Sequence, residues 1–85
     1  MTEFTYTIKD DLGLHARPAG LLATKCASFN SKVSLTFGDK TVDCKKLIRL
    51  LTLGLKKGDT FTVSVEGEDE KTAASELEKF FAENL

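Results

Sequence analysis

Apolar and polar side chains alternate along residues 4–8, 33–37 and 61–65. A period of two turns one side of an extended segment toward a core and the other toward solvent. Each stretch therefore predicts a β-strand with one buried face. Residues 40–44 predict a fourth, short strand that pairs back on its predecessor, because the Gly38–Asp39 step before them is a hairpin turn signal.

Three other stretches follow a helical period. From Pro18 to about residue 27, small and apolar residues recur every three or four positions, which predicts a helix with one apolar face. The members of that face are Ala19, Leu22, Ala23, Cys26 and Ala27. Residues 47–53 are rich in leucine and are followed by Gly54, which favours a short helix. Residues 68–85 predict a final helix, whose acidic first residues suit the positive end of the helix dipole.

These elements give the order β-α-β-β-α-β-α. Strands that are apolar on one side only need a cover on one face only. We therefore expect an α+β open-faced β-sandwich, in which a four-stranded antiparallel sheet carries three helices on one face. A chain of 85 residues is long enough for one core and too short for two, so residues 1–85 are expected to form a single domain.

Charge and hydropathy exclude several classes of protein. Twelve basic residues stand against 13 acidic ones, and the net charge of -1 argues against a nucleic-acid binder, which normally carries a basic excess. No run approaches the roughly 18 apolar residues of a membrane span. No secretory segment precedes the first predicted strand. We expect a monomer in the cytoplasm that does not insert into a membrane.

The two cysteines, Cys26 and Cys44, are compatible with free thiols or with a disulfide between them. Free thiols are favoured, because isolated cysteines in a chain without an export signal are mostly small buried side chains in a reducing compartment. One histidine and two widely spaced cysteines do not make a tetrahedral metal site. We expect no metal.

The only histidine, His15, stands three residues before the only proline, Pro18. Proline is tolerated in the first turn of a helix, where its missing N–H costs nothing. His15, Ala16 and Arg17 should therefore lie at or just outside that turn. The first N–H groups of a helix lack internal partners and carry a partial positive charge, which suits an anion and above all a phosphoryl group.

The residue types at this helix start point to phosphate chemistry. A neutral imidazole is a good nucleophile, and the guanidinium of Arg17 can pair with two phosphate oxygens at once. The pattern suggests that His15 is a nucleophile aimed at phosphate. The alternative is a half-exposed histidine in a loop, or one that only caps the helix.

The stretch "GLHARPAG", residues 13–20, in this order of elements resembles the histidine-containing phosphocarrier (HPr) family of the bacterial phosphotransferase system. "KKLIRLLTLGL" and "VEGEDEKTA" are similar to that family's second short helix and to the entry of its last helix. The resemblance implies a phosphocarrier that receives a phosphoryl group from enzyme I, itself phosphorylated by phosphoenolpyruvate. It would pass the group to IIA domains of sugar permeases. Such a protein carries the group covalently, needs no cofactor and is not an enzyme in the turnover sense.

The resemblance also assigns roles to residues of this sequence. It implies that His15 is phosphorylated on Nδ1, that Arg17 contacts the phosphoryl group, and that the backbone of Ala16 and Arg17 binds it. The implied partner-docking residues are Gly20, Leu47, Ile48, Arg49, Leu51 and Thr52. The pattern of residues 47–53 supports such a surface independently, because its five apolar residues surround too much of a short helix for all to be buried.

Lys46 departs from the family pattern, in which this position is usually a serine. In low-GC Gram-positive bacteria a dedicated kinase phosphorylates that serine to regulate catabolite repression. A lysine cannot accept phosphate by that route, so this chain has no regulatory serine there.

Three other functions remain open at this point. A regulatory module of the same fold would dock on its partners without carrying phosphate, and a nitrogen-regulatory member would share the His-x-Arg-Pro stretch. An RNA-binding α+β domain would need aromatic side chains on the open face of the sheet. The aromatic residues of the strands alternate as core positions do; they are Phe4, Tyr6, Phe37 and Phe61.

Overall fold

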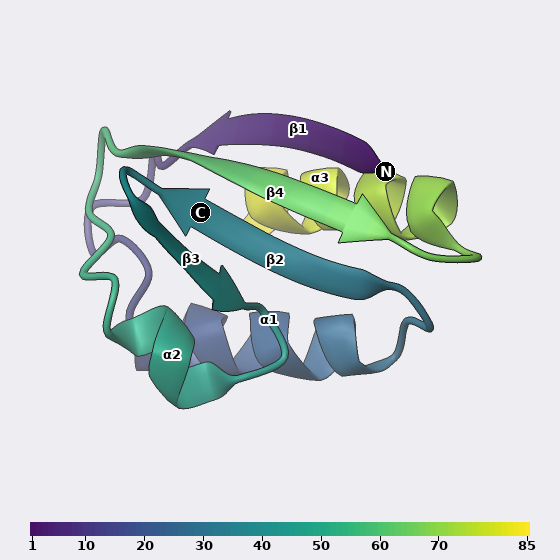
Figure 1. Ribbon diagram of the computed structural model, residues 1–85. Helices are drawn as coiled ribbons and strands as arrows, with labels where there is room; N and C mark the ends of the chain where they lie inside the picture. Colours follow the sequence, from purple (N-terminus) through teal and green to yellow (C-terminus); the bar gives the residue numbers. More distant parts are fainter.

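Four strands form one antiparallel sheet in the computed structural model, which describes residues 1–85 (Figure 1). The elements are β1 (Thr2–Thr7), α1 (Ala16–Ala27), β2 (Lys32–Phe37), β3 (Lys40–Asp43), α2 (Leu47–Leu51), β4 (Thr60–Glu66) and α3 (Glu70–Asn84). The strand order across the sheet is β1-β4-β2-β3. Helices α1 and α3 lie behind the sheet in Figure 1, and α2 packs against α1 beside β3. The predicted fold class and element order are confirmed.

The register of the sheet explains why one face is buried. Val63 of β4 pairs with Phe4 of β1 and with Leu35 of β2, so these side chains point to the same face. Val63 and Leu35 belong to one cluster of 22 buried residues, and the half-buried Phe4 packs against it. Phe81 of α3 makes an edge contact with Phe61 at 5.2 Å between ring centroids. Side chains from sheet and helix therefore interdigitate at the centre of the core.

The opposite face of the sheet is polar. A row of threonines crosses all four strands, formed by Thr5, Thr62, Thr36 and Thr41. The strand aromatics point to the covered face instead, and burial raises the pKa of Tyr6. The open face thus lacks the aromatic platform on which an α+β RNA-binding domain stacks bases.

Several boundaries differ from the sequence prediction. Helix α1 begins at Ala16, so Pro18 is its third residue rather than its first, and Ala27 is exposed rather than part of the buried face. Ile8 is buried although β1 ends at Thr7, because the core continues into the following loop. No helix combines the length and the apolar character needed to cross a membrane.

Cys26 and Cys44 are free thiols, and neither is exposed to solvent. A hydrogen bond with Cys26, together with burial, raises the pKa of the Cys44 thiol. The two cysteines serve as small core residues, as favoured by the sequence.

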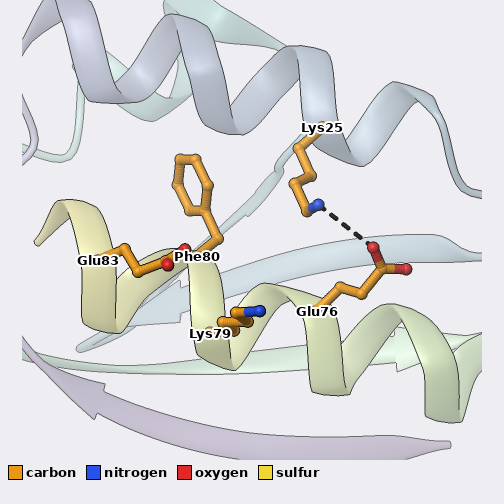
Figure 2. Close-up of a pocket in the computed structure, with 5 residues that line it drawn as sticks. All are labelled: Lys25, Glu76, Lys79, Phe80 and Glu83. Atoms are coloured by element: carbon orange, nitrogen blue, oxygen red, sulfur yellow. Dashed lines mark hydrogen bonds and ion pairs between the residues drawn. The ribbon is translucent and has the colours of Figure 1, made fainter.

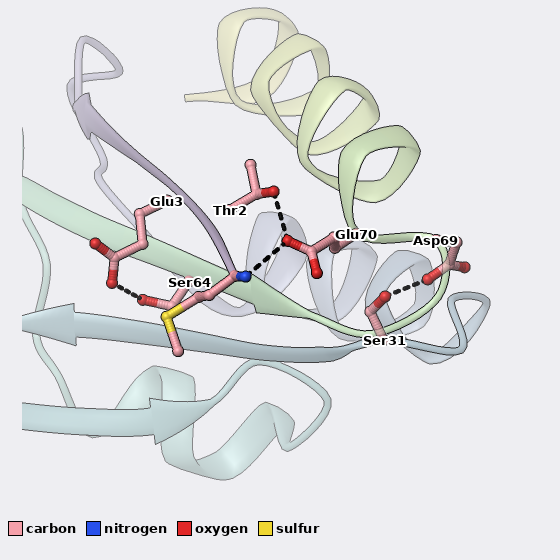
Figure 3. Close-up of polar contacts among 7 residues, drawn as sticks. Thr2, Glu3, Ser31, Ser64, Asp69 and Glu70 are labelled. Atoms are coloured by element: carbon pink, nitrogen blue, oxygen red, sulfur yellow. Dashed lines mark hydrogen bonds and ion pairs between the residues drawn. The ribbon is translucent and has the colours of Figure 1, made fainter.

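The start of α3 is tied to the sheet by hydrogen bonds (Figure 3). The Ser31 hydroxyl and the Asn30 N–H both donate to the Asp69 carboxylate, and the Thr2 hydroxyl donates to Glu70 at 2.7 Å. These bonds hold the pKa of both carboxyl groups below the usual range. Gly67 permits the approach, since a Cβ there would lie 2.6 Å from the Cα of Ser31.

Candidate functional site

His15 occupies the N-cap position of α1. Its backbone is extended, with φ -97° and ψ -174°, and its carbonyl accepts the first helical hydrogen bond from the Ala19 N–H at 3.0 Å. Its side chain makes no capping hydrogen bond. The residue therefore has the position of a cap without the bond that makes a cap stabilising. The alternative of a histidine that serves only to cap the helix does not fit this geometry.

The first turn of α1 has N–H groups without partners. The N–H groups of Ala16 and Arg17 find no acceptor in the protein, and Pro18 has no N–H to offer. The first turn contains no acidic residue, and the exposed Arg17 pairs with no carboxylate. A cation at this end of a helix opposes the helix dipole. The arrangement concentrates positive potential where an anion could bind.

A tight turn of the backbone sets the position of His15. Gly13 has φ +67°, and a Cβ on it would lie 2.8 Å from the Cα of Lys56 and closer still to the Leu55 carbonyl. The N–H of Leu14, the next residue, donates to that carbonyl at 3.1 Å. Only glycine allows the two backbones to approach so closely at this φ. The segment after α2 thereby supports His15 from one side.

The end of α3 supports the same loop from the other side. The Leu85 carbonyl accepts the Lys9 N–H at 2.6 Å and the Asp10 N–H at 2.7 Å. Leu85 itself is buried. The loop between β1 and α1 is therefore fixed at both ends by backbone contacts from distant parts of the sequence.

His15 lines an open surface cavity of about 310 Å³. Besides His15, Arg17 and Pro18, its walls are formed by Asp10, Leu12, Leu21, Glu83 and Asn84. The two leucines are unusually exposed for their type, Leu12 at 71% and Leu21 at 48%. Sequence reasoning missed the two carboxylates, because Glu83 reaches the site only through the packing of α3. The one available signal was the place of Asp10 in the loop before His15.

Helix α2 and the two residues after it divide their apolar side chains between the core and solvent. Leu50 and Leu53 are buried, whereas Ile48 is 70% and Leu47 is 37% exposed. Leu51 is half-buried and packs against the core. As expected from the sequence, the five apolar residues of this segment are not all buried.

The polar residues proposed for docking lie near the same helix. Arg49 is exposed, and so is Thr52, whose hydroxyl donates to the Arg49 carbonyl at 2.6 Å. Gly20 lies on α1, the helix that α2 packs against, and a Cβ on it would meet nothing within 4 Å. Lys46 is the N-cap of α2, exposed, and makes no capping bond through its side chain.

A second cavity lies between α1 and α3 (Figure 2). Lys25 and Glu76 form an ion pair across it at 3.3 Å, and Phe80 supplies its one apolar wall. It contains no histidine, serine or cysteine, so the cavity that His15 lines remains the candidate functional site. Glu83 lines both cavities.

The family model described as "PTS HPr component phosphorylation site" matches residues 2–83. The chain belongs to the HPr family. It is thus a member of a family of phosphocarriers of the phosphotransferase system, as the stretch around His15 indicated.

Two relatives illustrate the likeness. The phosphocarrier protein HPr of Buchnera aphidicola subsp. Acyrthosiphon pisum (strain APS) is 41% identical over 71 residues, which are 84% of each chain. The crystal structure of HPr-C-His from Thermoanaerobacter tengcongensis is 36% identical and covers the whole of both chains with a TM-score of 0.88. Sequence and fold therefore agree on the family.

Some similar structures are dimers. An HPr dimer from Thermoanaerobacter tengcongensis is 34% identical, with a TM-score of 0.77 over 98% of this chain and 95% of its own. Membership of the HPr family therefore does not decide between a monomer and a dimer for this chain.

Proposed function

We propose that His15 accepts a phosphoryl group on Nδ1 from phospho-enzyme I and passes it to IIA domains of sugar permeases. The observation that carries the proposal is the start of α1, where an uncapped His15 side chain stands beside two N–H groups without partners. The first turn of α1 also lacks the acidic residue that would favour the helix dipole and carries Arg17 instead, an arrangement that suits a bound anion better than it suits the stability of the helix.

The proposed transfer needs one nucleophile and a set of positive groups. The Nδ1 lone pair of His15 forms the new N–P bond while the bond from phosphorus to the donor atom breaks, and the donor atom keeps that electron pair. The N–H groups of Ala16 and Arg17 would bind phosphoryl oxygens, and the Arg17 guanidinium would pair with them from solvent. Positioning and charge stabilisation are most of what phosphoryl transfer requires.

The proposed role requires no metal or other cofactor on this chain, because the phosphoryl group itself is the covalent cargo. The chain would act as a carrier without turnover of its own. A relay between enzyme I and the sugar permeases would operate in the cytoplasm. Because Lys46 lacks a hydroxyl group, serine-kinase regulation at this position is not part of the proposal.

Partners would dock on a surface formed by Gly20, Leu47, Ile48, Arg49, Leu51 and Thr52. Its exposed apolar centre is Ile48 with Leu47, and Arg49 supplies a positive rim. A partner that fits this surface has an apolar hollow and acidic residues around it. Transfer to two unlike partners favours a modest interface that dissociates quickly.

The proposal is tested by incubating the chain with phosphoenolpyruvate, magnesium and enzyme I and then measuring its intact mass. We expect a gain of one phosphoryl group that is lost on acid treatment. The variant His15→Ala should gain nothing and keep its fold, because His15 contributes little to the core. A matched control is Thr24→Ala, an exposed change elsewhere on α1. The proposal fails if an enzyme I that phosphorylates another carrier leaves the wild-type chain unmodified, or if His15→Ala is modified equally.

A further inference from the structure

Two carboxylates share the cavity with the candidate phosphoryl acceptor. Asp10 comes from the loop before α1, and Glu83 comes from the last turn of α3. Together with His15 and Arg17 they line a cavity of about 310 Å³. Charges that line one open cavity act on an ion bound in it, and salt weakens this effect as it shortens the Debye length, which is ~8 Å at physiological salt. Their charges would therefore act on any anion bound at His15.

Neither carboxylate is neutralised by a cation. Glu76 on the same helix pairs with Lys25, whereas Glu83 forms no ion pair, not even with Lys79 one turn before it (Figure 2). Asp10 has no ion pair either, and its Oδ1 accepts only the neutral N–H of Leu12 at 3.4 Å.

Arg17 lies in the same cavity and does not pair with either carboxylate. Arg17 and the two carboxylates therefore form no ion pair with one another. A phosphoryl group on His15 would be attracted by Arg17 and by the N–H groups of α1, and repelled by Glu83 and Asp10.

We infer that Glu83 and Asp10 raise the free energy of the phosphorylated chain, so that the phosphoryl group is bound and still passes on readily. The inference rests on the proposed phosphorylation of His15. A site with positive groups alone would stabilise the phosphorylated state and slow its discharge to the next partner. The two carboxylates offset part of that stabilisation without touching the phosphoryl group.

The equilibrium constant of phosphoryl exchange between enzyme I and the chain tests this inference. It is calculated from the concentrations of the phosphorylated and unphosphorylated forms of both proteins when they are not bound to each other. The affinity of docking therefore does not alter it. We expect Glu83→Gln to shift the equilibrium about three- to tenfold toward the phosphorylated chain at low salt. Asp10→Asn should shift it in the same direction. At about 1 M salt, where the Debye length is ~3 Å, both shifts should shrink.

Glu78→Gln is the matched control, because Glu78 lies on α3, is exposed and lines neither cavity. It removes the same charge and should leave the equilibrium unchanged. Thermal unfolding of Glu83→Gln should equal that of wild type, which separates an electrostatic role from a structural one. Equal constants for wild type and both cavity variants at low salt would overturn the inference while leaving His15 as the acceptor. If the wild-type chain takes up no phosphoryl group, the proposed function fails as well.

Discussion

The starts of α1 and α3 are built in opposite ways. At the start of α3, Asp69 and Glu70 place negative charge at the positive end of the helix, and both carboxylates accept hydrogen bonds from the sheet or its loops. At the start of α1, no acid is present, Arg17 adds positive charge, and the His15 side chain bonds to nothing. Both helices cover the same sheet (Figure 1).

The difference indicates that the start of α3 contributes to stability, whereas the start of α1 is suited to chemistry. The start of α3 carries the protein's own carboxylates, which would repel an anionic ligand there. The start of α1 is left unsatisfied at some cost to the helix, as is common where a structure departs from its most stable local arrangement at a functional site.

The largest expected effect on stability comes from the backbone that supports His15. Gly13→Ala should lower the free energy of unfolding by about 3 kcal/mol, because the new Cβ meets the backbone of residues 55 and 56 at a strained φ. Gly20→Ala is the control. It has open space and lies inside α1, so it should raise stability by about 0.5–1 kcal/mol. Urea unfolding measures the free energy of unfolding of both variants and of wild type. If Gly13→Ala is as stable as Gly20→Ala, glycine is not required at position 13.

A smaller loss is expected at the start of α3. Ser31→Ala should cost about 1–2 kcal/mol, because it removes a buried hydroxyl that donates to the Asp69 carboxylate. Phosphoryl uptake should be unchanged, since His15 lies in a different part of the molecule. A variant of Ser31 that lost uptake while still folded would contradict the separation of the two helix starts.

The pH dependence of this loss has a defined sign. Hydrogen bonds hold the pKa of Asp69 below its usual value, so the folded protein binds this proton less readily than the unfolded chain. The stabilisation is fully present above the ordinary carboxyl pKa of about 3.9 and disappears as pH falls through the lowered value. Asp69→Asn should therefore be less stable than wild type at neutral pH, and the difference should shrink in acid. A difference that stays constant from neutral to acid pH would rule out this origin.

The smallest expected change in stability is at Arg17. Arg17→Glu places an acid in the first turn of α1, which suits the helix dipole, but adds a third carboxylate to the cavity of Asp10 and Glu83, so the free energy of unfolding should change by less than about 1 kcal/mol. The rate of phosphoryl uptake should fall at least tenfold, because the guanidinium that would pair with the phosphoryl group is replaced by a repelling charge. A folded variant that takes up the phosphoryl group as fast as wild type would remove Arg17 from the mechanism.

The sequence predicted the sheet well, because the alternation in residues 4–8, 33–37 and 61–65 follows directly from burial of one face. Helix ends were less predictable. Pro18 suggested the first residue of α1, yet the backbone of Ala16 and Arg17 is already helical, which proline at the third position permits.

The nucleophile was predictable and its surroundings were not. His15 and Arg17 lie close in the sequence, so a local motif suffices to find them. Asp10 and Glu83 share the cavity only because the end of α3 packs against the loop after β1, through the hydrogen bonds to the Leu85 carbonyl. That contact has no local signal in the sequence.

The backbone amide chemical shifts of the chain before and after phosphorylation test the central claim most directly. If the start of α1 is left open for a phosphoryl group on His15, the amide resonances of Ala16 and Arg17 should move most. Those of Asp69 and Glu70, at the acidic start of α3, should stay in place. A phosphorylated chain whose Ala16 and Arg17 amides do not move, or whose largest changes lie at α3, would contradict the account.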